Sequence, residues 1–268
     1  MNEPAASLFS LLLSDPVSPE SRLIAEALAK FLNVPFLDAM HKAKHAWGVL
    51  SEGMDETAAQ ELKTFFAGSG VSCLVVPDST LVSLPPAQMI TKGEFSSEGI
   101  RVPMKPGEVA LFRWDRLCVI GAAGFNETTT RTVQKESGPS MGQKALSLGI
   151  LMSTGIPLSV GGKKKKVEKI EQREEQVFFL DLLYDHPPFR LRIDARYFDY
   201  SFLKERKAYN AFGNFRILVE DVVRLAPPAF QSRGARVLSQ GKPASGMGYE
   251  SLDDLERECR WLAALKRV

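Results

Sequence analysis

In the first 77 residues, short apolar segments typical of buried strands alternate with segments whose apolar residues have helical spacing. Residues 8–13 form a short apolar run typical of a buried strand, and residues 23–32 place apolar side chains on one helical face. Ser18 and Pro19 mark the start of that helix, and Asn33 lies at its end. Further helices are predicted from residue 36 to 46 and after the capping residue Asp55, and further strands at 47–50 and 71–76. The predicted order is β-α-α-β-α-β.

Strand signals dominate the chain after a proline-containing linker at residues 77–89. Alternating side chains at 99–104 and a return strand at 111–121 predict a hairpin around Pro106 and Gly107. A second hairpin is predicted from strands at 177–184 and 189–193. Asn214 resembles the cap of an amphipathic helix that ends at Pro227. These signals predict a mainly antiparallel β domain with one packing helix.

Two further segments complete the organisation of the chain. Residues 126–175 are rich in polar residues and glycine with little periodicity, which predicts a long flexible insertion. After a glycine-rich joint at 241–248, Ser251 and Asp254 form the signature of a capping box. The helix that follows carries an apolar seam of Leu252, Leu255, Cys259 and Leu262. We therefore predict an α+β protein with domains at 1–80, 81–228 and 229–268, the insertion lying within the second.

The first module resembles a known binding fold. The residues that carry the resemblance are Asp38, Ala39, Ala43, residues 48–54, Ala59, Leu62, Lys63, Gly70 and Val71. They look like the C-terminal domain of the bacterial ribosomal stalk protein, whose fold the Clp protease adaptor shares. In the stalk domain, lysines on helix faces meet translation factors, and Lys30, Lys42, Lys44 and Lys63 are available here. The family's valine, glycine and lysine pattern between its first two helices is not reproduced, so factor binding is not expected.

The second domain is similar in architecture to bacterial pleckstrin-homology-like modules. The similarity rests on strands followed by one amphipathic helix and on Trp114 within residues 112–117. It implies that residues 88–228 form one domain of about seven strands and a helix, with the insertion as a loop between strands. Both resemblances are to folds that bind other molecules.

Composition sets few limits on function. The chain has 268 residues and is 44% hydrophobic. Its formal net charge is only +2, so the protein as a whole has no strong electrostatic attraction to nucleic acid or to an anionic membrane. Three scattered cysteines provide neither a disulfide framework nor a paired metal motif. Residues 8–13 lack the basic flank of a signal peptide, and no apolar stretch reaches the roughly 20 residues of a spanning helix. We expect a cytoplasmic protein.

No catalytic, metal or cofactor motif is found in the sequence. His41 and His45 have the spacing of a metal pair, but lysines surround them and no glutamate lies between them. His186 lies in a predicted turn. Four carboxylates could in principle meet at a magnesium ion, although pairing of Asp194 with Arg190 or Arg192 is the commoner arrangement. They are Asp194, Asp199, Glu220 and Asp221. We expect no cofactor.

Three functional hypotheses remain open. The leading one is a noncatalytic adaptor with a protein partner, in which the insertion and the C-terminal seam are docking elements. The second is a peripheral binder of anionic lipid or nucleic acid through the run Lys163, Lys164, Lys165 and Lys166, whose attraction acidic residues at 168–175 partly cancel. The third is an enzyme whose carboxylates meet only in the fold. The seam also permits a homodimer, although burial within the same chain needs no partner.

Overall fold

The computed structural model describes residues 8–81, 83–105, 107–137 and 165–268. By its internal contacts the chain forms two compact units, residues 1–125 with 176–268 and residues 126–175. The α+β class predicted from the sequence is confirmed. Within the described residues, no helix has the length and apolarity needed to cross a bilayer.

The N-terminal module has the predicted β-α-α-β-α-β order. Its elements are β1 (Phe9–Leu13), α1 (Ser21–Leu32), α2 (Phe36–Lys44), β2 (Val49–Met54), α3 (Glu56–Gly68) and β3 (Cys73–Pro77). The sheet has the order β2-β1-β3, and both pairings are antiparallel. Because β1 is the central strand, Leu11, Leu12 and Leu13 are all buried. This explains why the run is almost entirely apolar; its one polar residue, Ser10, is also buried and donates its hydroxyl to Asp78.

Local signals in the sequence fix the ends of these helices. The Asp55 carboxylate accepts a hydrogen bond of 2.8 Å from the Ala58 amide, as the predicted N-cap of α3. Asn33 adopts a left-handed conformation (φ 50°) and closes α1. These two boundaries therefore rest on ordinary capping chemistry. The predicted start of α1 at Ser18 and Pro19 is wrong, because α1 begins at Ser21 and no side chain caps its first turn.

The following part of the chain holds two sheets. A five-stranded sheet has the order β11-β8-β9-β10-β4, and a three-stranded sheet the order β5-β6-β7. The strands are β4 (Ala87–Met89), β5 (Glu94–Phe95), β6 (Gly99–Lys105), β7 (Glu108–Arg113), β8 (Leu117–Ser137), β9 (Lys165–Tyr184), β10 (Phe189–Asp194) and β11 (Phe230–Gln231). The predicted second hairpin is the antiparallel pair β9–β10, whereas β4 and β11 pair in parallel with β10 and β8.

The strand predicted at 111–121 is divided in the structure. A 3-10 turn at Trp114–Arg116 separates β7 from β8, so the two halves belong to different sheets. Trp114 is buried at this corner, and its indole N–H donates to the Ser96 carbonyl at 2.8 Å. The sequence pattern does not reveal this corner, because hydrophobicity alternates on both sides of it. A short turn with a buried tryptophan keeps the apolar spacing of a strand.

The helices of this part are α5 (Ala211–Leu225), α6 (Arg233–Ser239) and α7 (Leu252–Leu265). Asn210, and not Asn214, caps α5 by accepting a hydrogen bond from the Gly213 amide. Asn214 lies inside the helix and is buried, where its amide bonds both backbone groups of Ala208. Two asparagines four residues apart both fit a cap, and the prediction took the wrong one. Helix α6 is not among the elements predicted from the sequence.

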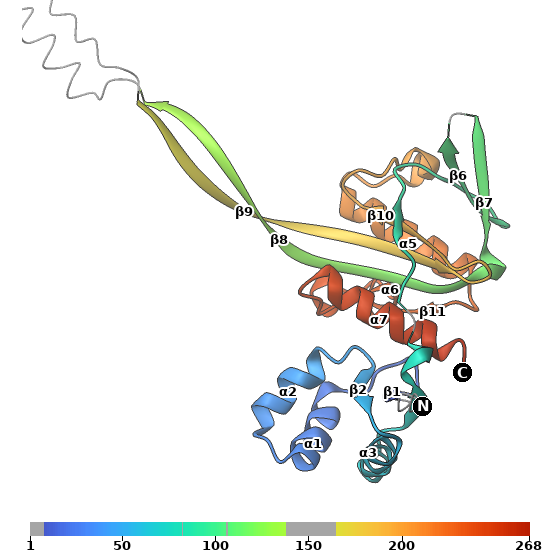
Figure 1. Ribbon diagram of the computed structural model, residues 1–268. Helices are drawn as coiled ribbons and strands as arrows, with labels where there is room; N and C mark the ends of the chain where they lie inside the picture. Colours follow the sequence, from blue (N-terminus) through green and yellow to red (C-terminus); the bar gives the residue numbers. More distant parts are fainter. Residues whose placement is uncertain (1–7, 82, 106, 138–164) are drawn as a thin grey trace, which may run out of the picture. The chain divides into compact units, whose positions relative to one another are not determined.

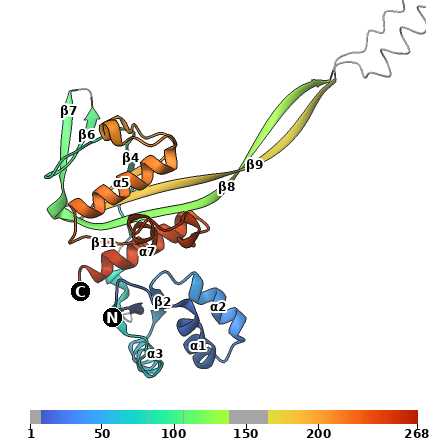
Figure 2. The ribbon, with the colours of Figure 1, turned by 180° about the vertical axis from the view of Figure 1, so that it is seen from behind.

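Helices cover both faces of the five-stranded sheet (Figures 1 and 2). On one face Phe178 contacts Phe212 and Phe215 of α5, with ring centroids 4.8 and 5.7 Å apart. On the other face, Gly121 of β8 lies so close to Cys259 of α7 that a Cβ there would stand 2.4 Å from its sulfur. The core therefore extends through the sheet into α7.

Strands β8 and β9 continue into the stretch predicted as the flexible insertion. β8 ends at Ser137 and β9 begins at Lys165, so residues 126–137 and 165–175 are extended strand. Residues 138–164 lie outside the described residues. This includes Lys163 and Lys164 of the lysine run, while Lys165 and Lys166 begin β9.

Candidate interaction site

The four candidate carboxylates do not come together. Asp194 pairs with Arg196 at 2.6 Å, and Asp221 pairs with Arg206 and Arg224. Asp199 accepts from Ser201, and Glu220 lies 3.3 Å from Arg216. In the part of the chain that the structure describes, no three histidine, cysteine or acidic side chains are grouped where they could hold a metal ion.

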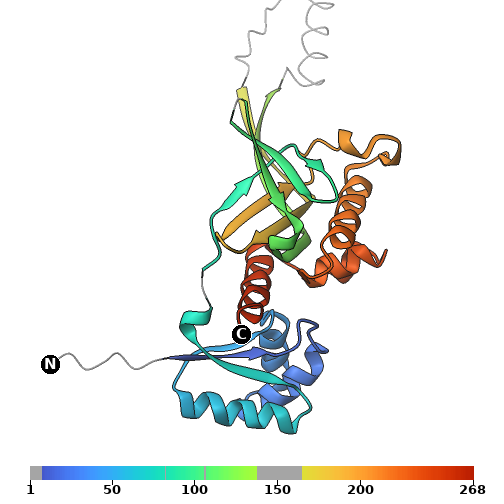
Figure 3. The same ribbon diagram turned by 90° about the vertical axis from the view of Figure 1, so that its right-hand side faces the viewer.

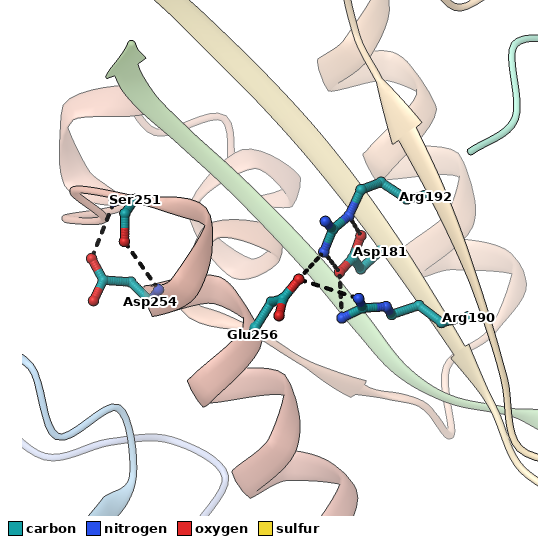
Figure 4. Close-up of polar contacts among 6 residues, drawn as sticks. All are labelled: Asp181, Arg190, Arg192, Ser251, Asp254 and Glu256. Carbon is teal, nitrogen blue, oxygen red and sulfur yellow. Dashed lines mark hydrogen bonds and ion pairs between the residues drawn. The ribbon is translucent and has the colours of Figure 1, made fainter. Parts of the chain in front are cut away.

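A buried charge cluster joins the sheet to α7 (Figure 4). Asp181 of β9 is fully buried and accepts two hydrogen bonds from Arg192 of β10, at 2.6 and 2.7 Å. Glu256 of α7 lies 2.8 Å from Arg192 and 3.2 Å from Arg190. The expected pairing of Asp194 with these arginines is therefore wrong. Register explains it, because Arg192 lies directly opposite Asp181 on the neighbouring strand.

The electrostatics of this cluster favour a structural role. Burial acts to lower the pKa of Arg192, but hydrogen bonds and attraction from Asp181 and Glu256 raise it overall. The charges of two arginines and two carboxylates cancel. Paired and hydrogen-bonded burial is the condition under which such charges are tolerated inside a protein. We therefore interpret the cluster as the connection between β9, β10 and α7.

The C-terminal seam is buried within its own chain. Leu255, Cys259 and Leu262 have no exposed surface, and Leu252 is half-buried. The capping box predicted for Ser251 and Asp254 is present, and Figure 4 shows both of its hydrogen bonds. A docking surface for another chain therefore has to be sought elsewhere.

Figure 3 shows α7 beside the N-terminal module, and two tryptophans connect them. Trp261 of α7 is fully buried, and its indole N–H donates to the Leu13 carbonyl at 2.9 Å. Trp47 stacks on Tyr249 with centroids 4.6 Å apart and donates to Asp254 at 2.7 Å. These contacts hold the helix against the module and leave the outer faces of α1, α2 and α3 free for other roles.

The cysteines are buried core residues, and we expect their thiols to be unreactive in the folded protein. Cys73, Cys118 and Cys259 are buried and free, and burial raises the pKa of the Cys73 thiol to about 12. The pKa values of Cys118 and Cys259 are raised by the same cause. Burial keeps these thiols neutral in the folded protein, whereas the thiols of the unfolded chain ionise at the ordinary thiol pKa. The free energy of unfolding is therefore unaffected by the thiols below that pKa and decreases as the pH rises above it.

Alkylation provides a test of this assignment. At about pH 8.5, where an ordinary thiol is half ionised, iodoacetamide is expected to modify the native protein only slowly and the urea-unfolded protein rapidly. Mass spectrometry of the intact chain counts the modified thiols. Rapid modification of even one thiol in the native protein would refute the assignment.

An exposed groove lies between α1 and α3. It has a volume of about 690 Å³ and is lined by Phe31, Glu56, Thr57, Gln60, Glu61, Thr64 and Phe65. Phe31 and Phe65 are half-buried and pack edge to face, with ring centroids 5.5 Å apart. The five polar lining residues all lie on one exposed face of α3, at helical spacing. This groove provides aromatic surface surrounded by acidic and neutral polar groups.

The charge of the groove is negative. Glu56 and Glu61 are its charged residues, and none of the lining residues is basic. Further apolar side chains are exposed where α1 leads into α2, at Leu32, Phe36 and Leu37. Of the lysines that the stalk resemblance brings forward, Lys30, Lys42 and Lys44 are exposed and Lys63 is half-buried, and none lines the groove.

The groove is not visible in the sequence pattern, because Phe65 fits an inward-facing position of α3 about as well as Phe66 does. Phe65 and Phe66 are adjacent, so they cannot both lie at the centre of one helical stripe. In the structure Phe66 is fully buried and Phe65 is displaced to the groove. The pairing with Phe31 depends on how α1 and α3 pack.

Geometry alone thus identifies the groove as the candidate site. Compared with known proteins, the chain matches no family model, no curated protein and no solved structure.

Proposed function

We propose that the protein is a noncatalytic adaptor that binds a basic segment of a partner protein in the groove between α1 and α3. The observation that carries the proposal is the combination of an aromatic floor with two glutamates and no basic residue along its walls. Aromatic contact area supplies affinity in protein interfaces, and complementary charge supplies specificity and a fast encounter.

The partner chemistry follows from these groups. An apolar side chain of the partner would lie on Phe31 and Phe65, and its lysines or arginines would meet Glu56 and Glu61. An amphipathic helix that presents both kinds of residue along one face fits this description. The resemblance to stalk and Clp-adaptor domains, which are also binding modules, supports the same class of function. We place the adaptor in the cytoplasm, where the free thiols of its core would stay reduced.

Charge reversal in the groove tests the proposal. The probe is a labelled amphipathic helical peptide of leucine and lysine, and fluorescence anisotropy measures its affinity. Glu56→Lys with Glu61→Lys is expected to weaken binding by about tenfold, because each exposed pair contributes roughly 0.2–1 kcal/mol and reversal replaces attraction with repulsion. Higher salt should also lower the affinity of the wild-type protein for the peptide, because salt screens the attraction between exposed charges.

Matched controls separate this effect from general charge. Glu98→Lys with Glu205→Lys changes two exposed residues outside the groove by the same total charge and should leave binding unchanged. A peptide of serine and lysine, without apolar side chains, should bind weakly to every variant. If the leucine–lysine peptide bound the groove variant as well as the wild type, or did not bind the wild type, the groove would not be the site.

A further inference from the structure

The outer strand β7 has a free edge. In the sheet order β5-β6-β7 its neighbour among the described residues is β6, and Figures 1 and 2 show β7 as the outermost strand of this sheet. The register pairs Ile100 with Phe112 and Val102 with Ala110. One side of β7 is therefore paired along its length, and the other faces away from the sheet.

Two backbone hydrogen bonds determine which residues present their amides at that edge. The Trp114 amide donates to the Glu98 carbonyl, and the Ser96 amide donates to the Gly99 carbonyl. In an antiparallel pair the hydrogen-bonded positions alternate along each strand. The backbone N–H and C=O groups of even-numbered residues in β6 therefore point toward β7, and those of odd-numbered residues point toward β5. The amide and carbonyl groups of Val109 and Leu111 consequently point outward, where another strand could pair with them.

The side chains of this edge are apolar and exposed. Val109 is 61% exposed and Leu111 is 41% exposed. Proteins usually protect an edge strand with lysine, proline, a bulge or a cover, because an open edge is a template for pairing with another chain. Residues 109–112 of β7 contain none of these charged or proline residues. An exposed apolar edge of this kind is typical of a surface that accepts a partner.

A pocket of about 280 Å³ adjoins the edge. Phe112 lies 5.1 Å from Phe189 and 5.4 Å from Tyr184, centroid to centroid, and these rings line it together with Leu111 and the turn at His186 and Pro187. Tyr184 is only 6% exposed, and among the described residues its hydroxyl has no hydrogen-bond partner. Burial raises the pKa of this hydroxyl, so it stays protonated and able to donate.

The charge of the pocket differs from that of the groove. Arg113 and Arg116 are its arginines, both exposed, and Asp185 is the one carboxylate that lines it. Arg113 is paired with the neighbouring Asp115, and Asp185 lies 4.0 Å from Arg267, so Arg116 is the lining charge for which the described residues provide no ion pair. An incoming acidic side chain would be attracted here, whereas a basic one would be repelled.

We propose that β7 binds an extended acidic peptide of a partner protein, which adds to the sheet as a further strand and places an aromatic side chain in the pocket. Main-chain hydrogen bonds to Val109 and Leu111 hold the strand, and the pocket selects the side chain. An acidic residue of the peptide meets Arg116. This surface shares no residue with the α1–α3 groove, so the proposal does not depend on the proposed function and the two can fail separately.

The test uses three synthetic peptides and the full chain. The first alternates valine with phenylalanine and carries two aspartates, the second has lysine in place of each aspartate, and the third is the first peptide with alternate backbone amides methylated. We expect the aspartate peptide to bind and to protect the Val109 and Leu111 amides from hydrogen exchange. Methylation and lysine substitution should each reduce affinity by at least about tenfold, because they remove edge hydrogen bonds and charge attraction.

Two variants locate the site on the protein. Leu111→Pro removes an outward amide and should abolish binding, whereas Leu111→Ala keeps that amide and should bind more tightly than the proline variant. If Leu111→Pro does not fold, the methylated peptide on the wild-type protein decides alone. The proposal would be overturned if the methylated peptide bound as tightly as the unmethylated one, if the lysine peptide bound more tightly than the aspartate peptide, or if the aspartate peptide did not bind. So would a dimer in sedimentation that Leu111→Pro dissociates, since a second copy would then occupy the edge.

Discussion

Alanine at position 48 is expected to destabilise the protein far more than alanine at position 53. Gly48 has φ +87°, and a Cβ there would stand 1.8 Å from the Trp261 ring. The left-handed conformation costs an alanine about 1–2 kcal/mol, and overpacking a filled core adds about 1–3 kcal/mol. The ring cannot easily shift, since its N–H is bound to the Leu13 carbonyl. We expect a loss of about 2–5 kcal/mol in the free energy of unfolding.

Gly53 is a matched control for the backbone effect. It also has a positive φ, of 73°, but no atom lies within 4 Å of the Cβ position. Gly53→Ala should therefore show only the conformational penalty. Urea unfolding followed by tryptophan fluorescence measures both variants. Equal shifts of the two midpoints would mean that Trp261 does not pack on Gly48 as described.

Removal of the Asp181 carboxylate is expected to be the other large effect. Asp181→Ala would leave Arg192 buried with half of its partners lost, and breaking a buried pair costs about 3–5 kcal/mol. Replacing both charges together, as Asp181→Leu with Arg192→Met, should cost less than Asp181→Ala alone, because no buried charge is left unpaired. Thermal unfolding compares the two variants.

Asp115→Ala is the control for this prediction. Asp115 also pairs with an arginine, Arg113, at 3.1 Å, but both side chains are more than half exposed. Its removal should hardly move the unfolding midpoint, because water screens an exposed pair. A similar loss for Asp115→Ala and Asp181→Ala would contradict the difference in burial on which the argument depends.

Periodicity predicted the order of elements in the N-terminal module because most of them carry their own signal, although the strand predicted at 47–50 is β2 at Val49–Met54, preceded by a turn at Trp47 and Gly48. The apolar stripe of α1, the Asp55 cap and the three consecutive leucines of the central strand are local features. The corner at Trp114 was missed because a tight turn can preserve strand spacing, and the α5 cap was misplaced because Asn210 and Asn214 fit equally.

The candidate sites were harder to predict because they depend on contacts between distant segments. Asp181 is one carboxylate in an apolar strand, and only its register against Arg192 reveals a partner. The groove needs α1 to pack against α3, which brings Phe31 to Phe65. The open edge of β7 follows from sheet order, and alternation of side chains does not encode that order.

The measurement that tests the adaptor role most directly is site-specific photo-crosslinking from Gln60 in the native host. Gln60 lines the groove and is exposed, and Ser245, which is exposed on a different element, is the control position. The account predicts a protein adduct from position 60 that joins it to a lysine- or arginine-containing segment and disappears when Glu56 and Glu61 are changed to lysine. No adduct from position 60, or the same adduct from position 245, would contradict it.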